Sequence, residues 1–250
     1  MSSKIKAVTF DLWDTMIDDE SDEPKRKERG LRSKAEERPH LVWEALNRDG
    51  PIPFAEVSLA YAVTDAAFTK VWKEHAITWT IEERLGVLFR GLGRQLGGAD
   101  LERLVRALAV MEVDIPPDPI PGVEESLSTL AGRYKLCVVS DTIITPGDGL
   151  RRLLETHGLK QYFSGFVFSD EVGRAKPHRR MFESAAGQLG VEFAEMVHIG
   201  DRDSNDVKGP QALGMKAVLF TAKRAQDAAI TTADAICDNH AALPATIDSL

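Results

Sequence analysis

The sequence predicts an α/β protein, in which a doubly wound parallel sheet carries an all-helical insert after its first strand. Three observations predict this fold. Short runs rich in Val, Ile and Phe recur along the chain, and they are continuous rather than alternating, as is typical of strands covered by helices on both faces. Segments with apolar residues at helical spacing separate these runs. One long interval, residues 18–115, shows helical patterns alone.

Six apolar runs are the expected strands. They lie at 5–10, 135–140, 165–169, 196–200, 216–220 and 235–237. The helices expected between them place apolar side chains on one face, namely Val123, Leu127 and Leu130, then Leu150, Leu153 and Leu154, then Phe182, Ala185, Ala186 and Leu189. Gly190 gives the last of these helices a stop signal. Because a helix joins each strand to the next, the strands are expected to run parallel.

The insert is expected to contain about four helices. Apolar residues follow helical faces over 57–75, 81–92 and 101–108, and the proline-rich stretch 116–122 ends the series, because proline breaks a helix. The charged stretch 18–38 mixes acids and bases without an apolar period, and we expect it to be a solvated loop or an exposed helix face.

The domain boundaries follow from this pattern. Residues 1–17 and 116–250 are expected to form the core domain, and residues 18–115 a helical cap domain. Since the insert directly follows the first strand, it would cover the active-site end of the sheet as a lid.

Composition restricts the partners and the location of the protein. A formal net charge of −8 over 250 residues argues against a broad surface for nucleic acid or anionic membranes, which bind basic patches. No run reaches the roughly 20 apolar residues that span a bilayer, and the N-terminus lacks the apolar region of a signal peptide. We therefore expect a cytoplasmic protein, monomeric or homodimeric, with a small-molecule partner.

Polar residues of catalytic type stand where the expected strands end. Asp11 follows the first strand, Ser140 ends the second, Lys176 follows the third, and Asp201 with Asp206 follows the fourth. The carboxyl ends of parallel strands meet at one edge of a sheet, where ligands bind. Each residue alone would be explained as a cap, a turn or a surface charge, but together they indicate a site.

This set suits covalent hydrolysis. An aspartate such as Asp11 can attack phosphorus or saturated carbon and form a covalent intermediate. Asp11, Asp201 and Asp206, with a backbone carbonyl near Trp13, offer the hard oxygen ligands that Mg²⁺ takes. Lys176 would neutralise charge, Ser140 would donate a hydrogen bond to a phosphoryl oxygen, and the hydroxyl of Thr15 would orient the nucleophile.

Four stretches resemble the motifs of the haloacid dehalogenase (HAD) superfamily, in members with a helical cap after the first strand. They are FDLWDTM, VVSDT, FSDEVGRAKPHRRMF and HIGDRDSNDVKGPQALGM, in that order. The resemblance covers about 1–17 and 116–220. It implies a Rossmann-like core, Asp11 as nucleophile, Ser140 as phosphate ligand and Lys176 as charge balance. It also implies Mg²⁺ held by Asp11, the Trp13 carbonyl and Asp201, with Asp206 as a second ligand or a support.

One position departs from this pattern. Phosphatases of the family carry a second aspartate two residues after the nucleophile, which acts as acid and base, and here that residue is Trp13. Loss of a positioned acid or base costs about a hundredfold to ten-thousandfold in rate. Asp14 is one residue further on, and its side chain is expected to point away from the nucleophile.

Three functions remain open from the sequence. The first is an Mg²⁺-dependent phosphatase of a small phosphorylated metabolite, working through an aspartyl-phosphate intermediate and acting best on activated leaving groups. The second is a metal-independent 2-haloacid dehalogenase, because the dehalogenases of the family also have an aromatic residue at the position of Trp13. The third is a catalytically weakened binding or regulatory protein.

Overall fold

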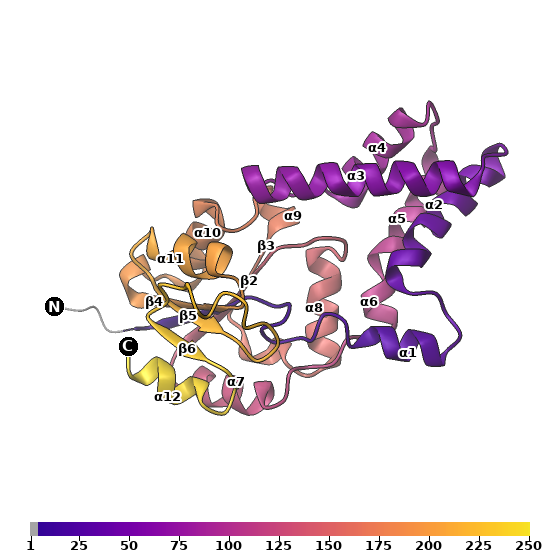
Figure 1. Cartoon of the computed structure of the whole chain (residues 1–250). Coiled ribbons are helices and arrows are strands. Elements are labelled where there is room, and N and C mark those ends of the chain that lie inside the picture. Colours follow the sequence, from indigo (N-terminus) through magenta and orange to yellow (C-terminus); the bar gives the residue numbers. More distant parts are fainter. Residues whose placement is uncertain (1–4) are drawn as a thin grey trace.

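The computed structural model describes residues 5–250, and its centre is a six-stranded parallel sheet with the strand order β3-β2-β1-β4-β5-β6 (Figure 1). The strands are β1 (Ala7–Phe10), β2 (Lys135–Ser140), β3 (Gly165–Phe168), β4 (Met196–Gly200), β5 (Lys216–Phe220) and β6 (Ala235–Cys237). All six expected strands are confirmed to within two residues. The third ends at Phe168 because Ser169 already begins a helix.

Helices occupy most of the segments between these strands and the segment after the last one. In the insert they are α1 (Asp22–Glu28), α2 (Lys34–Asp49), α3 (Phe54–His75), α4 (Ile81–Gly91), α5 (Gly98–Ala109) and α6 (Met111–Asp114). In the rest of the chain they are α7 (Val123–Ala131), α8 (Gly147–Thr156), α9 (Ser169–Val172), α10 (Arg179–Leu189), α11 (Gly209–Gln211) and α12 (Leu243–Asp248), with the shorter turns η1 (Lys160–Tyr162), η2 (Phe193–Glu195) and the π-helical η3 (Asp203–Lys208). In the described part of the chain, no helix has the length and hydropathy to cross a membrane.

The sheet is covered on both faces, as the continuous apolar strands predict. Successive strand residues face opposite sides, so Val8 and Phe10 pack with α7, α8 and α12, whereas Ala7 packs with α10. Figure 1 shows α7 and α12 on one side of the sheet and α10 and α11 on the other. Strand β1 lies in the middle, between β2 and β4. The sequence that follows β1 therefore emerges at the centre of the carboxyl edge.

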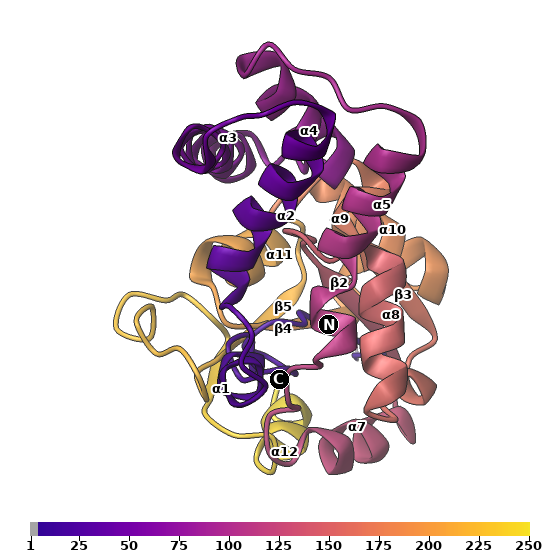
Figure 2. The ribbon, with the colours of Figure 1, turned by 90° about the vertical axis from the view of Figure 1, so that its right-hand side faces the viewer.

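The insert has an apolar cluster of its own, in which side chains of α2, α3, α4 and α5 meet. Local sequence signals start two of these helices. Ser33 and Glu36 form a capping box at α2, and Thr80 and Glu83 form another at α4, so each satisfies free amides of the first turn. The six helices exceed the four or so that the periodicity indicates, because α1 and α6 are too short to show a period. Figure 2 shows α2, α3, α4 and α5 gathered beyond one end of the sheet.

The expectation that the charged stretch 18–38 is exposed is wrong at several positions. Asp22, Arg26 and Lys34 are all buried. The Lys34 ammonium lies 2.8 Å from Asp22 Oδ1 and 3.4 Å from Glu112 Oε1 of α6. Burial of Asp22 and Lys34 is tolerated because they are paired, and the buried Arg26 donates to the Arg32 carbonyl at 2.9 Å. A single sequence does not show this pairing, since Lys34 and Glu112 are far apart in the chain.

Candidate active site

The polar residues at the carboxyl edge of the sheet converge because three central strands deliver them. In the strand register, Phe10 of β1 pairs with Val138 of β2 and Ile199 of β4. Asp11 therefore leaves β1 beside the ends of both neighbours, and its amide donates to the Ile199 carbonyl at 2.8 Å. Asp201 follows β4 directly. The sequence prediction that these strand ends meet is confirmed by this geometry.

Lys176 joins two of the predicted acids. Its ammonium donates to Asp11 Oδ1 at 2.7 Å and to Asp206 Oδ1 at 2.6 Å, and all three side chains are buried. Burial acts to lower the pKa of Lys176, but Asp11 and Asp206 outweigh it and raise this pKa above its ordinary value. The two acids therefore favour the charged form of Lys176 beside Asp11.

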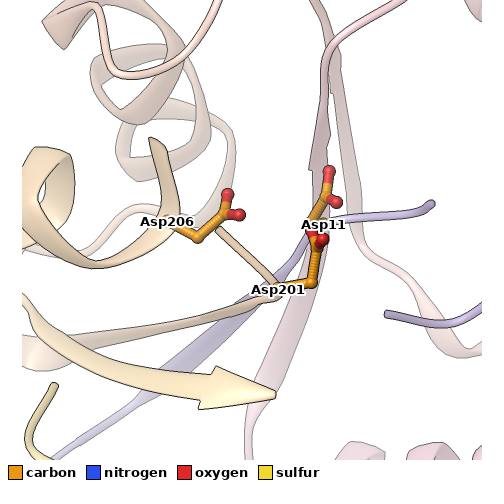
Figure 3. Close-up of side chains that lie close together, drawn as sticks. All are labelled: Asp11, Asp201 and Asp206. Atoms are coloured by element: carbon orange, nitrogen blue, oxygen red, sulfur yellow. The ribbon is translucent and has the colours of Figure 1, made fainter. Parts of the chain in front are cut away.

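Three carboxylates of this group lie close enough to share a metal ion. Oxygens of Asp11, Asp201 and Asp206 lie within 4.8 Å of one another, and Figure 3 shows the three side chains close together, with Asp11 and Asp201 just past the ends of β1 and β4 and Asp206 in η3. Gly200 allows the approach, because an added Cβ there would overlap the Asp206 carboxyl. Lys176 supplies one positive charge to three acids, so a divalent cation would complete the balance.

Asp201 carries the clearest sign of a missing partner. Its Oδ2 is buried and has no hydrogen-bond partner among residues 5–250; the nearest cationic atom, Arg202 Nε, is 3.8 Å away. Burial, and then the neighbouring Asp11 and Asp206, raise the pKa of Asp201 to about 8. An oxygen that is left without a donor beside two other acids fits a hard cation such as Mg²⁺.

Asp206 is also held by a chain of buried polar groups that the sequence analysis missed. Its Oδ1 accepts from His198 Nε2 at 3.1 Å, and His198 Nδ1 lies 2.7 Å from the hydroxyl of Thr9. Its Oδ2 accepts from the Arg202 amide at 3.0 Å. Burial acts to raise the pKa of Asp206, but Lys176 and His198 outweigh it and lower this pKa. His198 lies within β4 and its side chain reaches Asp206. The sequence motifs do not indicate this role of His198.

Ser140 and Thr15 are near the site without contacting its acids. Both are buried. The Ser140 hydroxyl donates to the Asp141 carbonyl at 3.3 Å. The Thr15 hydroxyl has no partner within the described residues, so a hydrogen bond from it to Asp11 is not formed here, and its orienting role stays a prediction. The Thr15 carbonyl accepts from His240 Nε2 at 2.8 Å, which fixes the turn after β1.

A cavity of about 70 Å³ opens onto Asp11, Lys176 and Asp206, and Trp13 and Asp19 line it as well. Asp14 is not among its lining residues. Asp14 has a left-handed backbone with φ 54°, and its Oδ1 accepts from the Asp19 amide at 3.4 Å. Burial and then Glu112 raise the pKa of Asp19 to about 7. Asp19 is thus a protonatable carboxyl on this cavity that the motifs do not indicate.

The insert contributes to the same cavity through Trp72, near the end of α3. Its indole nitrogen donates to Asp141 Oδ2 at 2.9 Å, and Asp141 Oδ1 accepts from the Lys176 amide at 2.8 Å. Burial raises the pKa of Asp141 to about 6, although Lys176 opposes the shift. Arg84 of α4 donates to the Ile143 carbonyl at 2.5 Å. Asp141 therefore connects the helical insert to the segment that positions Lys176.

Comparison with protein families agrees with this geometry. The model of the family described as haloacid dehalogenase-like hydrolase matches residues 5–214. The chain therefore belongs to this family of hydrolases.

Named relatives within the family include several phosphatases. A glyceraldehyde 3-phosphate phosphatase of Methanopyrus kandleri is 32% identical over 139 residues, 54% of this chain and 58% of that protein. The pyrimidine 5′-nucleotidase YjjG of Escherichia coli is 31% identical over 105 residues, 41% of this chain and 43% of that protein. The chain thus spans about half the length of these relatives.

Solved structures share the fold over nearly the whole chain. A HAD phosphatase of Thermococcus onnurineus has a TM-score of 0.66 at 24% identity and covers 97% of this chain and 98% of its own. An L-2-haloacid dehalogenase of Xanthobacter autotrophicus has a TM-score of 0.60 at 18% identity and covers 98% of this chain and 99% of its own. These similarities establish the architecture, and both activities occur on it.

Proposed function

We propose that this chain is an Mg²⁺-dependent phosphatase that hydrolyses a small phosphorylated metabolite through an aspartyl-phosphate on Asp11. The observation that carries the proposal is the buried group of Asp11, Asp201 and Asp206, whose oxygens lie within 4.8 Å of one another. Lys176 pairs with Asp11 and Asp206, and Asp201 has only the Arg202 guanidinium nearby, at 3.8 Å. The named phosphatases among the relatives support the same reaction type.

The proposed reaction has two steps. In the first, a carboxylate oxygen of Asp11 attacks phosphorus, the bond from phosphorus to the leaving oxygen breaks, and the leaving group departs with the electron pair. In the second, water attacks the phosphorus of the aspartyl-phosphate, which releases inorganic phosphate and regenerates Asp11. Lys176 holds Asp11 in place and offsets the negative charge of the phosphoryl oxygens. Ser140, at the end of β2, is the proposed donor to one of those oxygens.

Asp11, Asp201 and the carbonyl of Trp13 would hold Mg²⁺, with Asp206 as a further ligand or as the support of Lys176. When bound, the cation supplies positive charge that reduces the repulsion between the carboxylate and the phosphate. Residues 18–115 are the proposed cap. Their contact with the site runs through Trp72 and Asp141, so movement of the insert would be transmitted to the Lys176 segment.

Trp13 sets the preference for leaving groups in this proposal. An indole cannot protonate the departing oxygen, so esters with weakly basic leaving groups, such as acyl and aryl phosphates, would react best. Asp19 lines the same cavity, and it is the proposed proton donor for more basic leaving groups.

A phosphate-release screen tests the function. Wild type and Asp11→Asn are assayed on aryl, acyl and alkyl phosphates, with Mg²⁺ and with EDTA. Phosphate release that needs Mg²⁺ and falls at least about a thousandfold in the variant is expected. Release that is equal in Asp11→Asn, or that is unaffected by EDTA, would contradict the proposal.

Dehalogenation is the second candidate, and Trp13 is the observation that favours it, because a halide leaves without a proton. The reaction would use Asp11 on carbon and would need no cation. Halide release from 2-haloacids in EDTA tests it, and the phosphatase proposal predicts none.

A further inference from the structure

A larger hollow, which we call the side cleft, adjoins the catalytic cavity. The side cleft has a volume of about 460 Å³ and is lined by α3, η3 and the segment 224–230. Trp72, Lys176, Arg202 and Asn205 line both the side cleft and the catalytic cavity. The two hollows therefore meet at these four side chains, and a molecule with its phosphate at Asp11 lies next to the side cleft.

The side cleft is positively charged in a protein whose formal net charge is −8. Five cations and two acids line it. Both acids are already paired, since Asp203 Oδ2 lies 2.7 Å from Lys208 Nζ and Asp227 Oδ2 lies 2.7 Å from Arg224 Nη1. Lys176 is engaged by the catalytic acids. The charge left to a ligand is therefore that of Lys73 and Arg202.

These two cations are accessible. Within residues 5–250, Lys73 forms no ion pair, and the nearest acid to Arg202 is Asp201, at 3.8 Å. The Arg202 guanidinium lies 5.9 Å from the centroid of the Trp72 ring, so the ring limits how far that side chain can move away from the opening. Arg202 thus stands at the junction of the two hollows with its hydrogen-bond donors available.

A second hollow beside the catalytic cavity is negatively charged, unlike the side cleft. It is reached past Trp13 and Asp19 and is lined by three acids and two bases. Its bases, Lys34 and Arg38, both pair with Glu112. A negatively charged substituent would be repelled there and attracted to the side cleft.

We propose that the substrate carries a second anionic group, a carboxylate or a second phosphate, which Arg202 and Lys73 bind in the side cleft while the transferred phosphate lies at Asp11. This inference rests on the proposed phosphatase function and adds the class of substrate to it. Each exposed charge pair contributes modestly, so loss of one cation is expected to cost about fivefold in selectivity.

The experiment compares three aryl phosphates that differ at the para position. They are 4-carboxyphenyl, 4-phosphonophenyl and 4-carbamoylphenyl phosphate, of which the last is a neutral match in size. In wild type with Mg²⁺, kcat/KM for the carboxylate or the phosphonate is expected to exceed that for the amide about tenfold, and the better of the two identifies the anion. Added salt should reduce the difference.

Variants assign the effect to the side cleft. Arg202→Gln should lower the ratio of charged to neutral substrate about fivefold, and Lys73→Gln with Arg202→Gln should bring it close to one. Arg90→Gln, which changes an exposed cation of α4 outside both hollows, should leave the ratio unaltered. A wild-type ratio near one, or a ratio that survives in the double variant, overturns the inference even if Asp11-dependent hydrolysis stands. Absence of phosphate release from all three esters overturns the phosphatase function itself, and the inference with it.

Discussion

Replacing Trp13 by aspartate should place an acid two residues after Asp11, where this protein has none, and so raise the turnover of alkyl phosphates. Trp13 is the second residue after Asp11 and lines the cavity of about 70 Å³ that opens onto it. A carboxyl at this position would share the cavity with Asp11, Asp19 and Asp206. Like charges and limited solvent raise the pKa of such a group, which keeps it protonated and able to donate to a leaving oxygen.

The size of the gain follows from two opposing effects. A positioned general acid contributes about a hundredfold to ten-thousandfold. Removing the indole lowers the stability of the fold, because Trp13 is partly buried and packs against the main core. Loss of a fully buried tryptophan costs about 3–5 kcal/mol, so a half-buried one costs less. Trp13→Asn loses the same contacts without gaining an acid, and we expect Trp13→Asp to exceed it by about a hundredfold on alkyl esters.

The assay is kcat/KM for both variants and wild type on 2-hydroxyethyl phosphate and 4-nitrophenyl phosphate, with Mg²⁺. The gain should appear on the alkyl ester and be less than about tenfold on the nitrophenyl ester, whose leaving group needs no proton. Equal rates for Trp13→Asp and Trp13→Asn on the alkyl ester would refute the reasoning. So would a wild type that already hydrolyses both esters equally fast.

Three further predictions concern single carboxyl and imidazole groups. Because the pKa of Asp19 is raised to about 7 and the protonated form is the donor, wild-type kcat/KM on alkyl phosphates should fall as the pH rises through 7, and a profile unchanged in Asp19→Asn would contradict its role. Asp201→Asn should abolish the stabilisation by Mg²⁺, which for wild type is about 2.7 kcal/mol at a hundred times the Kd; a thermal shift with Mg²⁺ that persists in the variant would exclude Asp201 as a ligand. Burial lowers the pKa of His240 from 6.5 to about 4, so the unfolded state binds the proton first as the pH falls, and about 2 kcal/mol of stability is lost between pH 7.5 and 5. The free energy of unfolding, measured with urea at pH 7.5 and 5, should therefore fall by about 2 kcal/mol less in His240→Gln than in wild type. An equal fall in both proteins would contradict the role of His240.

The strands were predictable because their burial makes them continuous apolar runs. The runs at 135–140, 196–200 and 216–220 match β2, β4 and β5 at every residue. Strand ends in a parallel sheet share one edge, and for this reason Asp11 and Asp201 could be placed together before any coordinates were known.

The rest of the site depends on contacts that a single sequence does not encode. Trp72 reaches Asp141 from 69 residues away, and its helical spacing resembles that of an ordinary core residue. His198 alternates with apolar residues inside β4, where a buried imidazole has no sequence signal. The burial of Lys34 was missed for a related reason, because its stretch is polar throughout and its partner Glu112 lies in a later helix.

The charges of the site favour phosphate over halide chemistry. Asp11, Asp201 and Asp206 are buried together, and Lys176 is the cation that contacts two of them. A carboxyl with a pKa of about 8, such as Asp201, binds a proton at neutral pH unless a cation replaces it. A dehalogenase that worked without metal would keep this acid protonated, with no task in the reaction. In a phosphatase the same acid would lose its proton on binding Mg²⁺, which would supply positive charge opposite the phosphate. The unpartnered oxygen of Asp201 is therefore accounted for by the phosphatase and left unexplained by the dehalogenase.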